Sequence, residues 1–600
     1  MQAIILAAGM GKRLGDLTKD NTKCMIKVNG VTLIERMLQQ ITHQGIRKII
    51  MVVGFRSERL KSFIATLSYK YDIEYVENPV YETTNNIYSL YLAKDYLLKD
   101  DTLLFESDLI FEDKLIEEIL VHPYPNLALV AKFESWMDGT VVTLDDEQNI
   151  VKFITKESFV FEEITSYFKT VNIYKFSKEF SDTRYVPFLE AYSKALGNNE
   201  YYEQVLKVIA LLDQPDIKAL DIRNLSWYEI DDIQDLNIAE SIFADEESRL
   251  IKLQQRYGGY WRYPHIIDFC YLVNPYFPNK KLLSEIKANF ERLLIEYPSG
   301  LAINNLLAAK YFWIKPEYVC VGNGAAELIK SLMNITEGKV GINYPTFEEY
   351  PNRYSTDRII RYTATKTDFH YTADNLMQYY EDKDISCLLL INPDNPSGNF
   401  IPKHDVIRLL NWTQDNNIRM IVDESFVDFS ENFEQNSLLK DEVLEKYKNL
   451  VVVKSISKSY GVPGLRLGIV ASSDLELMAL LKNDISIWNI NSFAEFYMQI
   501  YGKYEQNYKT ACRIFVAERE RFRKQLSQIS FLRVIPSQAN YFLCEVIGRT
   551  AGTLTRELLK HNILIKDCSG KHGFENKEYV RIAVRNTIDN DLLIEKLRLL

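Results

Sequence analysis

Cysteine is scarce in this sequence, and its distribution argues against two common uses of the residue. There are seven cysteines among 600 residues, and no two of them are spaced as Cys-x-x-Cys. Disulfide-stabilised proteins and zinc sites both depend on dense or closely paired cysteines. The scattered, odd set from Cys24 to Cys568 therefore favours a reducing compartment, and we expect a cytoplasmic protein.

Long apolar runs and an excess of positive charge are also missing. The apolar N-terminal stretch, residues 3–8, is too short to span a membrane, and no basic segment precedes it as in a signal peptide. The formal net charge is −11. We therefore expect neither a nucleic-acid partner nor a membrane partner, and any anionic ligand requires local cationic groups.

Both halves of the chain alternate short apolar runs with segments of helical period. The predicted buried strands are 49–53, 102–105 and 127–131, then 318–321, 388–391, 420–422 and 450–453. This alternation predicts α/β domains with mainly parallel sheets. Between the halves, residues 236–256 are charged and helical in pattern, and Tyr257-Gly258-Gly259-Tyr260 follows. We predict one domain over residues 1–245 and a second over residues 246–600.

The first half begins with a glycine-rich turn directly after a predicted strand. Residues 6–14 read LAAGMGKRL, and Lys23 follows them. Glycines let backbone N–H groups approach phosphate oxygens, and nearby cations compensate the phosphate charge. A lone Gly-x-Gly would be read as a plain turn with surface cations, but the whole string after a strand favours a nucleotide site.

This string, with residues 28–36 (VNGVTLIER), resembles the nucleotidyltransferase family that activates sugar phosphates and choline phosphate, over residues 1–240. Asn21-Thr22-Lys23 departs from the family, which often has proline before the lysine. Residues 77–79 (ENP) and 84–90 (TNNIYSL) are similar to the phosphocholine cytidylyltransferase branch, which implies CTP. A polar loop that caps a helix is the alternative for Asn85. The resemblance implies a Rossmann-like domain with catalytic roles for Arg13 and Lys23, and it places the nucleotide on Leu6, Ala8, Gly9, Gly11, Lys12, Arg13, Lys23, Thr84, Asn85 and Asn86.

Carboxylates follow two apolar stretches of this half. Asp108 comes just after residues 102–106, and Glu229-Ile230-Asp231 comes after Trp227-Tyr228. Mg²⁺ bridges phosphate oxygens and prefers carboxylate ligands. A lone acid at a strand end is usually a helix cap or is solvated, but the resemblance implies that Asp108, Glu229 and Asp231 hold Mg²⁺, with Asp232 as an alternative to Asp231. In-line attack on the α-phosphorus needs positioning and charge neutralisation, so no side-chain nucleophile is expected.

The acceptor of the nucleotidyl group is expected near residues 132–138. Lys132, Phe133, Glu134, Trp136 and Asp138 fall where the cytidylyltransferase branch binds the acceptor's amine end. An aromatic face and a carboxylate suit an ammonium group. A purely structural tryptophan is the alternative.

The second half carries five segments, each at or after the end of a predicted strand. They are 322–327 (GNGAAE), 392–398 (NPDNPSG), 423–426 (DESF), 455–458 (SISK) and 464–468 (GLRLG). Pyridoxal phosphate (PLP) needs a lysine amine for its Schiff base, a carboxylate beside its pyridine nitrogen, a donor to its ring oxygen, and N–H groups, hydroxyls and a cation for its phosphate. Each segment is weak evidence alone, but together they predict a PLP site.

The set resembles fold-type I aminotransferases over residues 255–600, especially the branch of histidinol-phosphate aminotransferases and threonine-phosphate decarboxylases. The resemblance implies a large α/β domain plus a small α+β subdomain. It makes Lys458 the Schiff-base lysine, and it assigns cofactor binding to Ala325, Ala326, Phe347, Asn395, Asp423, Ser455, Ser457 and Arg466. Phe426 stands where many members have a tyrosine that donates to the PLP oxygen, so Asn395 acts there without a second donor.

Residues 579–585 (YVRIAVR) contain two arginines that a continuous strand would place on one face. By resemblance, Arg581 binds the substrate anion, and we expect Arg585 to add a second fork for a phosphate or phosphonate. Two surface arginines are the alternative. Tyr297 matches a tyrosine that reaches the cofactor phosphate of a neighbouring subunit, which implies a homodimer through the second domain.

The two halves share a substrate type, a small amine with an anionic phosphorus group. The whole chain resembles fused 2-aminoethylphosphonate cytidylyltransferase–transaminases of bacterial phosphonate biosynthesis. This implies transamination of phosphonoacetaldehyde by an amino-acid donor, followed by reaction of 2-aminoethylphosphonate with CTP. Two alternatives stay open. The first is a phosphocholine or phosphoethanolamine cytidylyltransferase fused to a PLP phospho-amino-acid decarboxylase or histidinol-phosphate-type aminotransferase. The second is a non-catalytic nucleotide sensor that regulates an aminotransferase.

Overall fold

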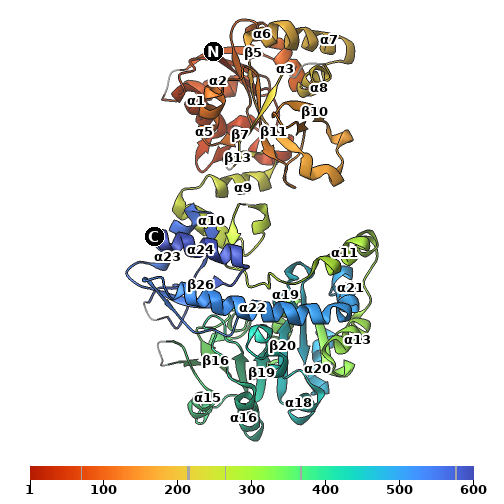
Figure 1. Ribbon diagram of the computed structural model, residues 1–600, viewed down its shortest axis with the longest axis vertical. Coiled ribbons are helices and arrows are strands. Elements are labelled where there is room, and N and C mark those ends of the chain that lie inside the picture. Colours follow the sequence, from red (N-terminus) through yellow and green to blue (C-terminus); the bar gives the residue numbers. More distant parts are fainter. Residues whose placement is uncertain (69–70, 213–215, 224, 264, 365–367, 575–576) are drawn as a thin grey trace. The chain divides into compact units, whose positions relative to one another are not determined.

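The computed structural model describes the chain except residues 69–70, 213–215, 224, 264, 365–367 and 575–576 (Figure 1). The chain divides into two compact units, Met1–Tyr257 and Gly258–Leu600. The boundary predicted at residue 245 falls between α9 (Ile233–Ile242) and α10 (Glu246–Gln255). The division places α10 in the first unit, where Lys252 Nζ lies 2.8 Å from Glu240 Oε2 on α9.

The first unit is built on a mixed sheet whose central strands are parallel. Strand β1 pairs in parallel with β4 and β6, and β4 with β5, whereas β11 is antiparallel to β6, β8 and β9. The order is β10-β9-β11-β6-β1-β4-β5, and β8 joins β12 to β11. The strands are β1 (Gln2–Ala7), β4 (Lys48–Val53), β5 (Asp72–Glu77), β6 (Thr102–Glu106), β8 (Leu127–Lys132), β9 (Val141–Leu144), β10 (Ile150–Ile154), β11 (Phe168–Phe176) and β12 (Lys218–Asp221).

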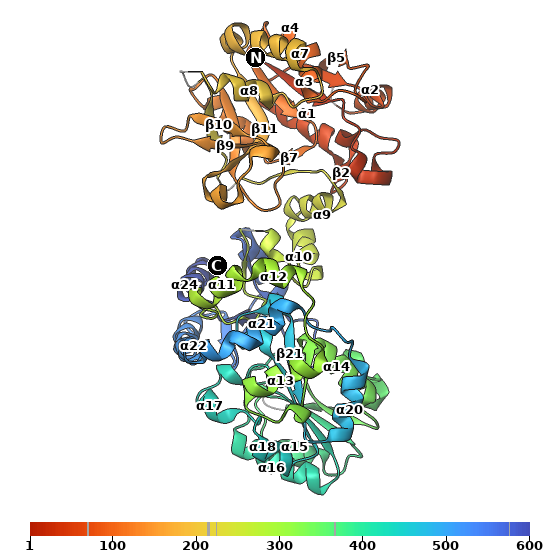
Figure 2. The same ribbon diagram turned by 90° about the vertical axis from the view of Figure 1, so that its right-hand side faces the viewer.

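Helices cover both faces of this sheet, which explains why its strands are apolar throughout (Figure 2). In β1, Ala3 and Ile5 pack in one buried cluster, and Ile4 and Leu6 pack in another. Successive strand residues point to opposite faces, so a strand buried on both faces is a continuous apolar run. One face is covered by α1 (Leu33–His43), α2 (Ser57–Ala65) and α5 (Lys114–Val121), and the other by α3 (Asn86–Leu92), α7 (Val186–Leu196) and α8 (Glu203–Ile209).

The second unit contains a seven-stranded sheet in the order β15-β21-β20-β19-β18-β16-β17. Its strands are parallel except β21, which is antiparallel to β15 and β20. The strands are β15 (Val319–Asn323), β16 (Val340–Tyr344), β17 (Ile359–Thr363), β18 (Cys387–Ile391), β19 (Arg419–Asp423), β20 (Leu450–Ser455) and β21 (Leu467–Ala471). These strands confirm the alternation that the sequence predicted for this half.

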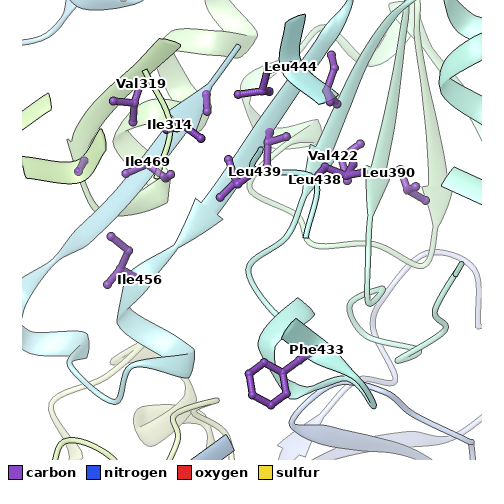
Figure 3. Close-up of a cluster of buried hydrophobic side chains, with 14 of the residues drawn as sticks. Ile314, Val319, Leu390, Val422, Phe433, Leu438, Leu439, Leu444, Ile456 and Ile469 are labelled. Carbon is purple, nitrogen blue, oxygen red and sulfur yellow. The ribbon is translucent and has the colours of Figure 1, made fainter. Parts of the chain in front are cut away.

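This second sheet is also buried on both faces. Figure 3 shows part of one cluster, where Leu390 and Val422 lie near each other and Phe433 lies farther off. That face is covered by α13 (Leu301–Phe312), α15 (Ala373–Tyr380) and α16 (Lys403–Asp415), and the other by α14 (Gly324–Ile335) and α20 (Leu475–Asp484).

A smaller antiparallel sheet completes the second unit. Its order is β22-β23-β26-β25, and it packs with three helices around one apolar cluster. The elements are β22 (Leu532–Val534), β23 (Tyr541–Val546), β25 (Lys566–Asp567), β26 (Tyr579–Ala583), α22 (Glu505–Leu526), α23 (Ala551–Lys560) and α24 (Thr587–Leu599). The unit thus has the large α/β part and the small α+β part that the resemblance implied.

Parallel register brings the polar segments of each unit to one sheet edge. In the first unit Leu6 pairs with Glu106, so the glycine turn and Asp108 emerge beside each other. In the second unit Ile391 pairs with Asp423, and Asp423 pairs with Val453. Ligands of open α/β sheets bind at such carboxyl edges. Separately, no helix in the described part of the chain is long and apolar enough to cross a membrane.

Candidate active sites

The first unit contains a cavity of about 360 Å³ at the carboxyl edge of its sheet. The ten residues expected to bind nucleotide all line it, as do the three carboxylates expected to bind metal. The wall therefore joins the glycine turn, the 84–86 segment and the acidic groups. Further lining residues that the sequence analysis did not assign include Asn78, Tyr81, Glu106, Ser107, Lys169, Asn172, Tyr201 and Glu203.

Gly11 is the position in the turn where a side chain is least tolerable. Its φ is +62°, in the left-handed region, and a Cβ there would lie 3.1 Å from Thr18 Cγ2 and 3.2 Å from Lys23 Cβ. Thr18 Oγ1 donates a 2.8 Å hydrogen bond to Gly11 O. Because no Cβ intervenes, the turn packs directly against the stem of Lys23.

Three carboxylates converge in this cavity. One oxygen each from Asp108, Glu229 and Asp231 lies within 4.8 Å of the others. Asp108 follows β6, Glu229 ends β13 (Trp227–Glu229), and the backbone N–H of Ile230 donates to Asp108 O at 3.0 Å. Asp108 Oδ1 is buried without a hydrogen-bond partner. An all-oxygen donor set with an unsatisfied carboxylate oxygen fits a hard divalent cation such as Mg²⁺.

Two cations lie against these carboxylates. Lys23 Nζ is 2.5 Å from Asp108 Oδ2 and 2.7 Å from Asp231 Oδ1, and Arg13 Nη2 is 3.1 Å from Asp231 Oδ2. Burial alone would lower the pKa of Lys23, but the two carboxylates raise it well above its ordinary value. Lys23 therefore stays charged, and both side chains stand where triphosphate oxygens would meet the acidic groups.

Asp232, the alternative to Asp231, has a different partner. Its Oδ1 accepts hydrogen bonds from the backbone N–H groups of Gln234 and Asp235 at 2.7 and 2.9 Å. Asp232 is therefore the N-cap of α9 and does not join the three converging carboxylates.

The predicted acceptor residues separate in the structure. Asp138 lines the cavity, but Lys132, Glu134 and Trp136 are not among its lining residues. Lys132 Nζ donates to Thr165 O. Trp136 Nε1 donates to Glu134 Oε2 at 2.6 Å, and its ring stacks on Tyr228 with centroids 4.1 Å apart. Trp136 and Glu134 are thus bonded to each other. This arrangement fits the purely structural role for Trp136 that the sequence left open.

In the second unit, Lys458 lies on α19 (Ile456–Ser459) between two aromatic rings. Its Nζ is 4.0 Å from the ring centroid of Phe426 and 5.4 Å from that of Phe347. Burial lowers the pKa of Lys458 to about 8, with Asp423 opposing the shift and Arg581 adding to it. An amine that loses its proton this readily is suited to nucleophilic attack and proton transfer.

Asp423 is buried at the end of β19, and neutral donors hold it in place. Its Oδ2 accepts from Tyr350 Oη at 2.9 Å, and its Oδ1 accepts from the backbone N–H of Ser425 at 2.8 Å. Tyr350 was not predicted from the sequence, and only its place three residues after Phe347 could have suggested it. A buried carboxylate with neutral partners fits the pyridine nitrogen of PLP, because that nitrogen can supply a compensating positive charge.

A cradle for an anion lies where α14 begins. Gly324 has φ +74°, and a Cβ there would lie 2.7 Å from Arg466 Nη2; a Cβ on Gly468 would lie 2.3 Å from the backbone nitrogen of Ala325. The N–H of Gly324 donates to Arg466 O at 2.8 Å. The guanidinium therefore stands over the amides of the first helical turn, an arrangement that fits the cofactor phosphate.

The predicted hydroxyls lie close to this cradle. The backbone N–H of Ser455 donates to Ser425 Oγ at 3.0 Å, and Ser457 Oγ lies 3.4 Å from Leu467 O. Neither serine hydroxyl makes a strong protein hydrogen bond within the described chain. Together with Lys458, Asp423 and Arg466, they fit PLP.

Arg581 has neutral partners. Its Nη1 donates to Asn395 Oδ1 at 2.8 Å and its Nη2 to Cys270 O at 3.1 Å, while its Nε is buried without an acceptor. No carboxylate pairs with it among the described residues. Lys566 is paired directly with Arg581 across β25 and β26, so the two side chains share a face. Lys566 makes no ion pair in the described chain. Its place directly after the apolar run 563–565 is the sequence feature that could have suggested it as a site residue.

Arg585 differs from the expectation that it would share a face with Arg581. Strand β26 ends at Ala583, so alternation along the strand does not extend to residue 585. Arg585 Nε donates to Asp589 Oδ2 at 2.8 Å, and its Nη1 donates to Asp268 O at 2.8 Å. The charge of Arg585 is thus already compensated by a carboxylate one helical turn later.

Tyr297 is 78% exposed, and its ring centroid lies 4.7 Å from that of Trp488. Residue 297 precedes α13 and faces solvent in this single chain. The role expected for Tyr297 in a neighbouring subunit stays a prediction.

Comparison with known proteins places these two sites in families. Residues 277–597 match the family described as aminotransferase class I and II. The chain belongs to this family. Residues 3–143 match the MobA-like NTP transferase domain. The chain is thus an enzyme with an N-terminal nucleotidyltransferase domain and a C-terminal fold-type I aminotransferase domain, and membership of the aminotransferase family implies PLP.

Three proteins that are similar in sequence or structure indicate the kinds of protein to which this chain is related. The CMP-5'-(3-aminopropyl)phosphonate synthase of Streptomyces rubellomurinus is 29% identical over 99% of this chain and 94% of its own length. The L-serine phosphate decarboxylase of Campylobacter jejuni is 30% identical over 55% of this chain and 87% of its own. A solved decarboxylase from Sulfurospirillum multivorans has a TM-score of 0.50 and 28% identity over 55% of this chain and 94% of its own.

Proposed function

We propose that the first domain transfers CMP from CTP to a small amine that carries a phosphonate or phosphate, releasing pyrophosphate. The observation that carries this proposal is the single cavity that joins the glycine turn to Asp108, Glu229 and Asp231. Those carboxylates would hold Mg²⁺, which neutralises triphosphate oxygens when bound. Lys23 and Arg13 stand beside them and orient the triphosphate for in-line attack.

The proposed role of the second domain is to form that amine. PLP, when bound, withdraws electrons from bonds at the carbon that carries the amino group. Lys458 holds or releases a proton near neutral pH because its pKa is about 8. Asp423 supplies the negative charge opposite the pyridine nitrogen, and Arg581 with Lys566 binds the anionic phosphorus group.

The reaction that we propose for this domain is transamination of phosphonoacetaldehyde by an amino-acid donor, giving 2-aminoethylphosphonate. The first domain would then couple this amine with CTP, giving CMP-2-aminoethylphosphonate. The name of the Streptomyces rubellomurinus relative supports an aminoalkylphosphonate as the acceptor, although that name specifies a 3-aminopropyl chain. The nucleotidyltransferase assay should therefore compare acceptors with 2-aminoethyl and 3-aminopropyl chains.

A second route to such an amine is favoured by the other two relatives, which are both named as decarboxylases. In this route the domain, with PLP bound, would decarboxylate an amino acid that bears a phosphate or phosphonate, releasing CO₂. The same Lys458 would return a proton to the carbon that loses CO₂. Arg581 and Lys566 would bind the phosphorus group as before.

The two routes differ in what they consume. Purified protein with PLP is incubated with phosphonoacetaldehyde and L-alanine, or with O-phospho-L-serine or its phosphonate analogues alone, and the products are identified by mass spectrometry. Amine and pyruvate from the first mixture support transamination, whereas amine and CO₂ from the second support decarboxylation. Absence of amine in the first mixture refutes the transaminase proposal. With CTP and Mg²⁺ added, CMP linked to the phosphonate or phosphate group of the amine is expected in either case.

Tyr297 and the exposed apolar side chains near it support a homodimer through the second domain. Ile295, Ile487 and Trp488 are 77%, 67% and 52% exposed. An exposed apolar group of this kind is typical of an interface. We also propose a cytoplasmic location, since all seven cysteines are free and buried. Sedimentation analysis of the full chain, with Trp488→Glu as the perturbing variant, tests the dimer.

A further inference from the structure

The nucleotidyltransferase cavity contains a second group of polar side chains beyond the metal carboxylates. Lys169 and Asn172 come from β11, and Glu203 begins α8. In a regular strand, residues three apart face opposite sides of the sheet. The register of β11 shifts between Thr170 and Tyr174, and Asn172 has φ +61°, so this bulge lets Lys169 and Asn172 line the same cavity.

Lys169 is a buried cation next to the metal site. Its side chain is 2% exposed, and Nζ lies 3.6 Å from Glu229 Oε2. One of its three N–H groups donates to Thr170 O at 2.7 Å. Its other acceptors are more distant, since Thr170 Oγ1 lies 3.5 Å and Glu229 Oε2 3.6 Å from Nζ, so Lys169 has donor capacity left for an anion that approaches the metal carboxylates.

Glu203 is a buried carboxylate that lacks a cation. It is 5% exposed, and Tyr174 Oη donates a hydrogen bond of 3.4 Å to its Oε1. No ion pair of Glu203 is found in the described chain. Burial raises its pKa, and the charge of Lys169 partly opposes this. A buried carboxylate on a cavity wall is costly unless a positive group pairs with it, so Glu203 favours a cationic ligand group.

Asn172 supplies an independent sign of a ligand. It is 6% exposed, and its Oδ1 accepts from Thr170 Oγ1 at 3.1 Å. Its amide nitrogen has no partner among the described residues, although Asn172 lines the cavity. An amide N–H group on a cavity wall without a protein acceptor can donate to a ligand oxygen or a water.

We propose that Lys169, Asn172 and Glu203 form the acceptor subsite of the nucleotidyltransferase domain. Lys169 and the Asn172 amide bind oxygens of the phosphonate or phosphate, and Glu203 binds a primary ammonium group. This inference rests on the proposed function. It assigns the ammonium to Glu203 in place of Glu134 and Trp136, which bond to each other outside the cavity lining.

This placement is compatible with the transfer step. A deprotonated oxygen of the acceptor attacks the α-phosphorus of CTP, a new P–O bond forms, and the bond to the β-phosphate breaks. The electron pair of that bond leaves with pyrophosphate, so no proton has to be removed from the acceptor. Lys169 holds the attacking group near the metal carboxylates, and Glu203 fixes its far end. A carboxylate favours a primary ammonium over a trimethylated one, because only the primary group donates hydrogen bonds to it.

The test measures pyrophosphate release by the full-length protein with CTP, Mg²⁺ and three acceptors. These are 2-aminoethylphosphonate, its N-trimethyl analogue and ethylphosphonate, which lacks the amine. The wild-type protein is expected to prefer the first. Glu203→Gln should lower kcat/KM for 2-aminoethylphosphonate about 100-fold, as expected when one partner of a buried ion pair is lost, and should leave ethylphosphonate unchanged. The matched control is Glu179→Gln, an exposed glutamate, which should keep the wild-type preference.

Two further variants separate the roles. Lys169→Met should raise KM for all three acceptors, and Lys169→Arg should restore part of the loss. If Glu203→Gln does not fold, Glu203→Asp makes the same comparison, with a several-fold loss confined to the amine-bearing acceptor. A wild-type protein that is inactive with every acceptor overturns the proposed function and this inference with it. An active wild type whose preference survives in the Glu203 variants overturns this inference alone.

Discussion

The ammonium of Lys458 lies 4.0 Å from the ring centroid of Phe426, three residues after Asp423. The ring gives the lysine an apolar neighbour on one side, and Phe347 lies on another. Asp423 is near enough to oppose the resulting pKa shift but does not form an ion pair with the lysine in the structure. The lysine is thereby kept close to its neutral form, ready for the cofactor.

This relationship predicts a pH-dependent cost to stability in the cofactor-free protein. Burial lowers the folded-state pKa of Lys458 from 10.5 to about 8, so the folded state binds the proton less tightly than the unfolded state. The cost is full below pH 8 and disappears as pH rises to 10.5. It amounts to up to about 3 kcal/mol, at 1.36 kcal/mol per pKa unit.

Lys458→Met should remove this cost. The variant should melt at a higher temperature than the wild type at pH 7, and the difference should shrink as pH approaches 10.5. Calorimetry of both cofactor-free proteins across this range measures the effect. A difference that does not vary with pH contradicts the assigned pKa. The same variant should not develop the visible absorbance of lysine-bound PLP.

Asp108 and Asp232 offer a matched pair in the first domain. Asp108→Asn removes a carboxylate from the converging set and leaves Lys23 with one partner fewer, so pyrophosphate release should fall at least about 100-fold. Asp232→Asn keeps a good helix N-cap on α9 and should retain activity. The assay is pyrophosphate release at saturating Mg²⁺. Unchanged release in Asp108→Asn would contradict the catalytic role assigned to Asp108, whereas no release by the wild type would favour the alternative in which this domain senses nucleotide without catalysis.

Alanine variants of Gly11 and Gly15 distinguish the effect of a local steric clash from the effect of backbone strain. Both have positive φ, +62° and +55°, but only a Cβ on Gly11 meets neighbouring atoms within 4 Å. Gly11→Ala should cost about 1 kcal/mol from the left-handed backbone, and Gly15→Ala at least as much, because φ +55° with ψ −124° is a conformation that side chains disfavour still more. Gly11→Ala should in addition displace Lys23 and weaken CTP binding about tenfold, while Gly15→Ala should bind CTP normally. Calorimetric titration with CTP measures both; equal weakening in the two variants contradicts the packing argument.

The cations of the second domain can be ranked by their counter-charges. Arg581 and Lys566 have no carboxylate partner in the described chain, whereas Arg585 is bonded to Asp589. Arg581→Ala should raise KM for the phosphorus-bearing substrate about 100-fold and Lys566→Ala about tenfold. Arg585→Ala should mainly lower stability, by about 1 kcal/mol. Amine formation and thermal melting, measured on all three, distinguish the roles; a larger KM effect in Arg585→Ala would restore it as the second anion-binding residue.

The sequence by itself determined the two α/β halves and the order of the chemical segments. Strands buried on both faces must be continuous apolar runs, so the apolar runs 49–53, 102–105, 388–391 and 450–453 predicted β4, β6, β18 and β20 to within one or two residues. Because the strands are parallel, segments that follow them meet at one edge. That geometry is enough to bring Asp423 near Lys458, and the glycine turn near Asp108.

Only the tertiary structure decided which charged side chains are compensated by others. The sequence predicted that Arg585 would bind the substrate anion with Arg581, but in the structure it forms an ion pair with Asp589. It also predicted that Trp136 would bind the acceptor, but its indole N–H donates to Glu134 and its ring stacks on Tyr228. Lys169 and Glu203 are 34 residues apart and reach one cavity through a strand bulge and a helix start. The electrostatic role of a charged group depends on the nearest opposite charge and on burial. Both are set by contacts between distant segments, which periodicity and spacing do not reveal.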